Sequence, residues 1–228
     1  MRNRFFGGTA LGVVLVLGVA SAHAQTWSLP IRAGWSNASI SGGSQLGSER
    51  VNGFVGSLGA ALRLNPDVSV EFDIAYAQKG AKGTITNEVA NSPSNPPQPG
   101  PIYRIEGETS LDYLEFWGMV IGHLEVADQW ELKGYLGVSL GNLLNAEVEG
   151  TANGEPIKLD VSDGLKSADW AGLVGGGIAY EIDPVVLTLD FFAELSFVDI
   201  NASVLDTDFK NRAYYTMLGV AIPLGGVE

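Results

Sequence analysis

The chain has 228 residues, with 13 Lys and Arg against 26 Asp and Glu, and its sequence contains no cysteine. The acidic excess excludes non-specific nucleic-acid binding, because contacts with phosphates depend on Lys and Arg side chains. Without cysteine, neither disulfides nor thiolate metal sites can hold the fold. The length suits one domain, and we expect that domain to be held together by hydrogen bonds and packing.

The first 24 residues have the layout of a secretory signal peptide. Arg2 and Arg4 precede an apolar run over about residues 10–20, and Ala22-His23-Ala24 has the small-x-small form of a cleavage site. The apolar run is too short to span a bilayer, which takes about 20 residues. We predict export and one mature domain over residues 25–228, without a cysteine for a lipid anchor and with 11 Lys and Arg against 26 Asp and Glu.

Apolar and polar residues alternate with a period of two along eight segments, which is the pattern of β-strands with two unlike faces. Soluble strands usually have about 5 or 6 residues, whereas a tilted strand needs about 9 to 11 to cross a bilayer. These segments are long enough to cross. They cover about 29–40, 53–64, 67–80, 109–124, 129–144, 168–182, 185–199 and 211–224.

The connections between these segments alternate in length. Short turns built on Pro, Asn or Asp lie at Asn65-Pro66-Asp67, at about 125–128 and at Asp183-Pro184. The other connections are long, at about 41–52, 81–108, 145–167 and 200–210, and one of them contains the proline-rich run NSPSNPPQPGP. Short turns at one end and long loops at the other are typical of outer-membrane barrels.

The charges favour one face of each segment. We expect the apolar face to carry no charge within these spans, since Lys or Arg there would cost about 2 to 4 kcal/mol at mid-membrane. An eight-stranded barrel has an interior filled by side chains, so charges on the other face must pair there. This predicted lumen charge network comprises Arg32, Arg63, Glu71, Asp73, Glu115, Glu131, Lys133, Glu181, Asp190 and Glu194.

Aromatic residues near the strand ends on the apolar face fit the girdles found at the two membrane interfaces. They are Trp35, Tyr76, Trp130, Trp170, Tyr180 and Tyr214. The patterns together predict an all-β fold, an eight-stranded antiparallel up-and-down transmembrane β-barrel with short periplasmic turns and long extracellular loops.

Six stretches in chain order resemble the PorT-like outer-membrane β-barrel family: IRAGWSNASISG, YAQKGAKG, LDYLEF, GYLGVSLGNLL, ADWAGLVGGGIAYEI and KNRAYYTMLGVAIPLG. The resemblance covers essentially all the mature chain and implies an eight-stranded barrel in the outer membrane. It implies no catalytic residues. One relative in that family takes part in protein secretion, and nothing in this sequence marks that role. The chain departs from many such barrels by ending in LGGVE rather than on an aromatic residue, so Leu224 is the candidate for recognition by the assembly machinery.

Two carboxylates of one segment, Asp190 and Glu194, invite a catalytic interpretation. Four residues of strand separate their Cα atoms by roughly 13 Å, whereas the paired carboxyl groups of glycosidases lie about 5 to 9.5 Å apart. Glu71 and Asp73, two residues apart, fit that range better. A lumen network with Arg32, Arg63 and Lys133 accounts for all four without chemistry, and we favour it.

Other candidate sites carry weaker signals. His123 is the single histidine after the signal segment, and a Ser-His-acid site would require it, but no G-x-S-x-G motif accompanies it. We expect a structural histidine near the interface. The glycines 172 and 175–177 lack the context of a dinucleotide loop and instead make room for Phe192 on the next strand. Asp206, Asp208 or the acids of the third long loop offer at most a weak Ca²⁺ site.

The leading hypothesis is a non-enzymatic outer-membrane barrel that acts as a structural anchor and displays its long loops to an unknown extracellular ligand. We expect no cofactor, no metal and no nucleic acid, a monomer, and contacts with outer-membrane lipid and the assembly machinery. The alternatives are a narrow pore or secretion-associated barrel, an outer-membrane lipid-modifying enzyme, and a secreted lipocalin-like barrel. The last would reverse the facing of every strand.

Overall fold

The computed structural model describes residues 26–41, 49–88, 102–152, 154–200 and 209–224. The signal segment, the proline-rich run, Asp206 and Asp208 lie outside the described residues. Among the residues described, no helix is long and apolar enough to cross a membrane. The elements are β1 (Thr26–Ser41), β2 (Val51–Asn65), β3 (Val68–Glu88), β4 (Ile102–Ala127), β5 (Trp130–Ala152), β6 (Glu155–Asp160), the 3-10 turn η1 (Ser162–Gly164), β7 (Ala168–Ile182), β8 (Val185–Ser196) and β9 (Lys210–Pro223).

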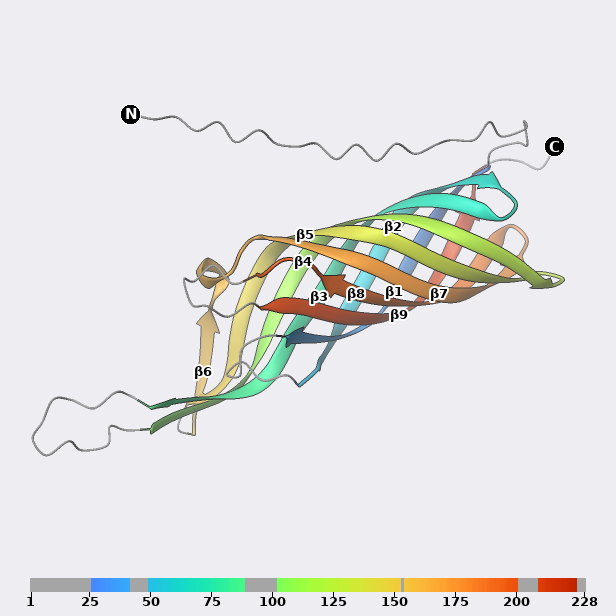
Figure 1. Cartoon of the computed structure of the whole chain (residues 1–228). Helices are drawn as coiled ribbons and strands as arrows, with labels where there is room; N and C mark the ends of the chain where they lie inside the picture. Colours follow the sequence, from blue (N-terminus) through green and yellow to red (C-terminus); the bar gives the residue numbers. More distant parts are fainter. Residues whose placement is uncertain (1–25, 42–48, 89–101, 153, 201–208, 225–228) are drawn as a thin grey trace, which may run out of the picture.

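Eight of the strands close into an antiparallel barrel, as predicted. Neighbours pair in the order β1-β2-β3-β4-β5-β7-β8-β9, and β9 pairs back onto β1. Figure 1 shows the strands steeply tilted around one cylinder, with the tight turns β2–β3, β4–β5 and β7–β8 gathered at one end. We call this the tight-turn end, and the opposite one the long-loop end. Closure leaves no unpaired strand edge along the cylinder wall, the condition for a sheet to sit in lipid.

The two faces of the wall differ as the alternation predicts. Large apolar side chains point outward from the middle of the strands, among them Phe72 and Leu136, which are 68% and 69% exposed. The inward positions instead hold buried charged and hydroxyl groups together with aromatic rings. A barrel dissolved in water would bury its apolar side, so this one requires an apolar surrounding. The lipocalin-like alternative is therefore wrong.

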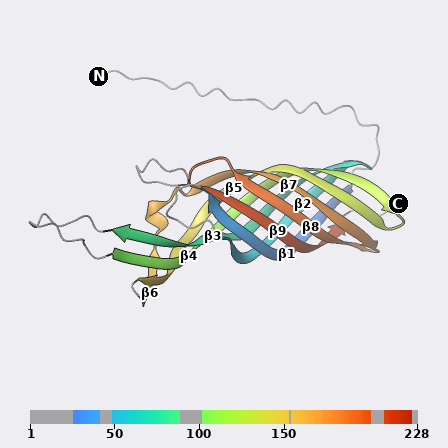
Figure 2. The ribbon, with the colours of Figure 1, turned by 60° about the horizontal axis from the view of Figure 1, so that its bottom comes forward.

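The strands are longer than predicted at the long-loop end. Residues 81–88 and 102–108 continue β3 and β4, while 145–152 continue β5 and are followed by β6. These parts of the predicted long loops are therefore strand. Together they form an outer sheet, defined here as residues 81–88, 102–112, 145–152 and 155–160, in which β6 pairs with β5 alone. Figure 2 shows it leaving the barrel beyond the ends of the other strands.

A β-bulge lies where β5 enters the outer sheet. Tyr113 of β4 pairs with Leu143, whereas Asp112 pairs with Asn145, so Leu144 is an extra residue in β5. The bulge reverses the side-chain alternation, because Gly141 and Ala146 are both buried on the inner side although they differ in parity. Beyond it, Glu147 and Glu149 share the outward face with Lys158 of β6 and form ion pairs with it at 2.9 and 2.6 Å. Hydrogen bonds with Glu149 and then Glu147 raise the pKa of Lys158.

The expectation that the outward face carries no charge over the predicted spans is wrong at the long-loop end. Asp112 lies on the outward face and accepts a hydrogen bond from Nε2 of Gln78 at 3.2 Å. Arg212 is also exposed there, opposite Leu195 and Ser39, close to the ends of β8 and β1. Asp199 lies beyond the end of β8. These residues lie past the apolar band, where water solvates a charge.

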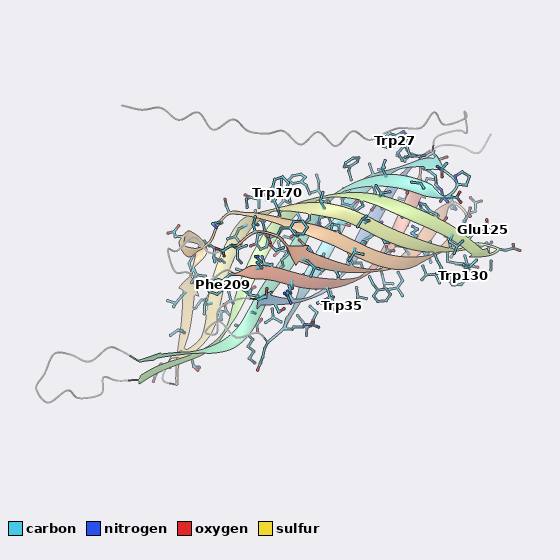
Figure 3. The ribbon with its side chains drawn as sticks, in the orientation of Figure 1. Trp27, Trp35, Glu125, Trp130, Trp170 and Phe209 are labelled. Carbon is cyan, nitrogen blue, oxygen red and sulfur yellow. The ribbon has the colours of Figure 1, made fainter. Side chains whose placement is uncertain are left out.

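The exposed tryptophans lie at two levels along the barrel (Figure 3). Trp27 and Trp130 lie towards the tight-turn end, and Trp35 and Trp170 lie nearer the long-loop end. The Tyr180 ring lies 4.5 Å from that of Trp130, and Tyr76 and Tyr214 belong to the long-loop level. The two levels bracket the apolar band, as interfacial girdles do. Sequence reasoning omitted Trp27, although it shares the parity of Trp35.

A charge placed in this band should destabilise the barrel. We expect Leu136→Arg to lower the free energy of unfolding by about 2 to 4 kcal/mol, because the arginine would face hydrocarbon. Leu159→Arg is the matched control, since Leu159 is 51% exposed on β6, outside the band. Urea unfolding in phospholipid vesicles measures both variants. Equal effects of the two substitutions would contradict the position assigned to the band.

Candidate functional site

The lumen is built in layers, and the layer nearer the tight-turn end is centred on one arginine. The Arg32 guanidinium contacts Glu71 at 2.7 and 3.1 Å, Asp73 at 3.0 Å and Asp190 at 2.9 Å. Asp190 also accepts hydrogen bonds from Tyr135 at 2.6 Å and Thr188 at 2.8 Å. We call this the Arg32 cluster. It ties β1 to β3 on one side and to β8 across β9 on the other.

Glycines give the Arg32 cluster its space. A Cβ at Gly59 would overlap the Asp73 carboxylate, and one at Gly177 would overlap that of Asp190. A Cβ at Gly219 would lie 2.8 Å from Cγ of Arg32, closer than packed atoms approach. In so narrow a barrel, long charged side chains fit only where the facing strand has none. The predicted role of the β7 glycines is confirmed at Gly175, which faces the Phe192 ring.

A layer of aromatic rings lies next to the Arg32 cluster, on its long-loop side. The Trp117 ring centroid lies 5.8 Å from that of Phe192 and 5.7 Å from that of Tyr215, and the Tyr135 ring lies 4.8 Å from Phe192. Met119 and Met217 are buried in the same core. This layer fills the cross-section with large apolar surfaces and separates two charged levels.

The second charged level is centred on Lys79. Its ammonium lies 2.6 Å from Glu115, 2.8 Å from Glu194 and 3.7 Å from Asp169. Trp117 and Tyr215 donate hydrogen bonds to Glu115 and Glu194, and Asn211 donates one to Asp169 at 2.8 Å. We call this the Lys79 cluster. Like the Arg32 cluster, it surrounds one cation with three carboxylates.

Apolar side chains fill the lumen at the long-loop end. Leu111 and Tyr113 are fully buried and pack with Ile40, Ala81, Ala146 and Ile200. Segments next to the strands complete this plug, because Val161, Leu165 and Phe209 pack against it. Backbone bonds hold these segments in place, from Ile200 to Phe209 at 2.8 Å and from Lys166 to Ile200 at 2.8 Å.

A cavity of about 440 Å³ opens at the tight-turn end. Its inner wall reaches Arg32 and Glu71, and its rim includes Asp67, Glu125 and Glu181. We call it the vestibule. Figure 3 places Glu125 at the tip of that end. The vestibule meets the charged layers only at the Arg32 cluster.

A chain of hydrogen bonds crosses the vestibule wall over four strands. Oγ of Ser69 on β3 lies 2.7 Å from Nε2 of His123 on β4, and Nδ1 of His123 lies 2.6 Å from Oε1 of Glu131 on β5. Arg63 of β2 donates to the other oxygen of Glu131 at 2.9 Å. The cavity is lined by all four residues.

The structure distributes the ten predicted lumen charges over different levels. Arg32, Glu71, Asp73 and Asp190 meet in the Arg32 cluster, and Glu115 and Glu194 meet in the Lys79 cluster. Arg63 pairs with Glu131 in the vestibule, where Lys133 and Glu181 also lie. Asp190 and Glu194 therefore belong to separate networks, and Glu194 pairs with Lys79 rather than with Arg32, Arg63 or Lys133.

Sequence reasoning missed two members of these networks, Lys79 and Asp169. Both have the inward parity of their own segments, so the alternation contained the signal. It also missed Ser69 as the partner of His123, because 54 residues separate them in the sequence. Within the residues that the structure describes, no group of His, Cys, Asp and Glu side chains is placed to hold a metal ion.

A family model agrees with this architecture. The sequence matches the family model described as outer membrane protein beta-barrel domain over residues 9–221. No curated protein matches it. Solved structures similar to it include OprG from Pseudomonas aeruginosa (12% identity, 89% of this chain and 98% of that chain, TM-score 0.45). Neisserial surface protein A is similar at 15% identity, 85% and 96% coverage and a TM-score of 0.43.

A third similar structure is Ail, the attachment invasion locus protein of Yersinia pestis, in complex with the heparin analogue sucrose octasulfate (14% identity, 86% of this chain and 99% of that chain, TM-score 0.39). Identities this low say nothing about a shared activity. The family match, in contrast, spans almost the whole sequence. The chain therefore belongs to the outer membrane protein beta-barrel domain family, and it lies in the outer membrane of a Gram-negative-type cell.

Proposed function

We propose that this protein is a closed structural anchor in the outer membrane that displays the outer sheet and its loops at the cell surface. The observation that carries the proposal is the filled lumen. Two ionic layers, an aromatic layer and an apolar plug occupy the barrel from the Arg32 cluster to the long-loop end. These layers leave no role in conduction for the charged side chains, because each cation is already surrounded by carboxylates.

The ionic layers act as cross-braces. Lys79 of β3 joins Glu115 of β4, Asp169 of β7 and Glu194 of β8, so one ammonium connects strands on opposite walls. The four groups are almost fully buried, where removal of the cation would leave three unpaired carboxylates. Charged groups pair with one another both in these layers and in the outer sheet. We therefore propose a non-enzymatic role for both regions.

The outer sheet supplies a surface for display. It extends β3, β4 and β5 past the barrel and adds β6, whose far edge has no neighbour among the strands described. Glu149 and Lys158 are exposed on it. We propose that the protein is a monomer and that it presents this sheet to an extracellular ligand. Its other partners in this proposal are membrane lipid and the assembly machinery. The PorT-like resemblance supports the same picture without adding a secretion role.

Removing the central cation of the Lys79 cluster should destabilise the barrel strongly. We expect Lys79→Met to lower the free energy of unfolding by about 3–5 kcal/mol, because three buried carboxylates lose their counterion. Lys158→Met is the matched control, since Lys158 also contacts two carboxylates but is exposed, and it should leave stability unchanged. Urea unfolding in vesicles, followed by tryptophan fluorescence, compares the variants. A wild-type midpoint for Lys79→Met would contradict the bracing role.

Single-channel recording separates the anchor from a pore. The folded protein in planar bilayers should show no steady ionic conductance, because the plug and the ionic layers obstruct the lumen. Heat modifiability on a gel, in which a folded barrel migrates differently before and after boiling, confirms that the recorded sample is folded. Stable, reproducible conductance steps from such a sample would establish the pore alternative instead.

The display orientation can be tested with epitope insertions at the two ends. An epitope inserted after Gly154, between β5 and β6, should bind antibody on intact cells. The same epitope inserted after Asp128, in the tight turn between β4 and β5, should bind only after the outer membrane is permeabilised. The reverse pattern would overturn the assignment of the outer sheet to the cell surface.

A further inference from the structure

The vestibule contains one arrangement that neither the anchor nor the display role uses. We propose that Ser69, His123 and Glu131 form a periplasm-facing catalytic triad that hydrolyses small, uncharged carboxylic esters. The proposal goes beyond the anchor function, and it departs from the expectation that His123 is a structural residue in a non-enzymatic barrel. The tight turns place this end of the barrel in the periplasm.

The hydrogen bonds have the order and the lengths of a serine-hydrolase triad. Ser69 Oγ lies 2.7 Å from His123 Nε2, and His123 Nδ1 lies 2.6 Å from Glu131 Oε1. A carboxylate can only accept, so Nδ1 carries the proton and donates it to Glu131. In the neutral imidazole, Nε2 is then the acceptor for the serine hydroxyl. This is the tautomer in which histidine acts as general base towards serine. A triad is recognised by this geometry on any fold, since the same constellation occurs on unrelated ones.

The carboxylate of the triad is itself fixed in place. Arg63 donates to Glu131 Oε2 at 2.9 Å, which leaves Oε1 for the histidine. Arg63 also binds the carbonyl oxygen of Pro66 in the β2–β3 turn. Glu131 and Arg63 are positioning residues, because they act on the reaction through His123. Other lumen serines differ, since the buried Ser139 donates directly to Glu194 and the partly buried Ser196 donates to Asp169.

A cation lies beside the proposed general base. Lys133 of β5 is the direct cross-strand neighbour of His123 of β4, so both side chains leave the same face of the sheet. Both line the vestibule. Two carboxylate-bound cations, Arg32 and Arg63, line the same cavity. Lys133 thereby supplies positive charge inside the cavity in which an oxyanion develops when Ser69 attacks a carbonyl carbon.

The shape and charge of the vestibule select the substrate class. Its volume of about 440 Å³ suits a small organic molecule. Asp67, Glu125 and Glu181 on the rim repel anionic substrates, whereas Ile121, Ala179 and Val186 provide apolar lining. An uncharged ester with a short acyl group fits both conditions. Water reaches the same cavity from the periplasm.

The reaction balances with the ester and water alone. Ser69 Oγ forms a bond to the carbonyl carbon while its proton moves to Nε2 of His123. The bond from that carbon to the alcohol oxygen then breaks, and the alcohol leaves with the proton from His123. Water, deprotonated by His123, attacks the acyl-Ser69 ester, and the acid departs as Ser69 recovers its proton. Ester and water thereby become acid and alcohol.

A fluorophosphonate carrying a fluorophore tests the nucleophile directly, because it reacts covalently with activated serine. The mature protein, folded in phospholipid vesicles, should be labelled at Ser69, as identified by mass spectrometry, and should hydrolyse p-nitrophenyl acetate above the rate of empty vesicles. Ser69→Ala should abolish both signals, and His123→Gln should slow them by about 10²- to 10⁴-fold through loss of the general base. Ser57→Ala, at another buried lumen serine, is the matched control and should retain both.

Substitutions of Glu131 distinguish a catalytic triad from a hydrogen-bond network that is merely structural. Glu131→Gln should lower the labelling rate, and Glu131→Asp should restore part of it, while both variants remain heat-modifiable barrels. Absence of labelling in the heat-modifiable wild-type protein would overturn the triad. Labelling that persists in Ser69→Ala or that is unaffected by His123→Gln would do the same. None of these results would bear on the anchor function, which is tested by the conductance measurement and by Lys79→Met.

Discussion

The structure depends on how charge is compensated inside a barrel whose outside faces lipid. Hydrocarbon excludes charged groups from the outward face, so polar residues of the membrane-spanning strands gather in the lumen. That interior is too narrow to hydrate them freely, and each charge needs a partner of opposite sign or a hydrogen-bonding partner. Arg32 and Lys79 meet this demand by binding carboxylates from several strands at once. The glycines at 59, 177 and 219 follow from the same constraint, because the ionic side chains need their volume.

Sequence alternation predicted the strand number, closure and the facing of most residues, because a period of two is a local property. It could not predict which charges pair. Glu194 belongs with Lys79, and Asp190 with Arg32, because the tilt and stagger of the strands decide which inward positions share a level. That stagger is a property of the closed sheet. For the same reason Ser69 and His123 could not be joined from sequence, although each had the inward parity.

Most of the outer sheet was mistaken for loops because its strands are polar, and the buried residues at its base, Ala81, Leu111 and Ala146, are too few to impose an alternation. Residues 145–152 of β5 and 155–160 of β6 belong to what the sequence predicts as an acidic connection, yet they pair regularly with their neighbours. The aromatic girdles were better predicted, since their outward parity and position near strand ends are visible in the sequence. The omission of Trp27 came from starting the first strand too late.

The extra residue Leu144 has a consequence for how such proteins can diverge. On one side of it β5 pairs with β7 within the closed cylinder, and on the other it pairs with β6 in a sheet that is open. A closed cylinder tolerates few changes in strand length, because each alters the stagger of all its neighbours. An open sheet has no such restriction. The bulge is therefore a natural graft boundary, beyond which hairpins can be lengthened, shortened or exchanged while the membrane-spanning frame stays the same.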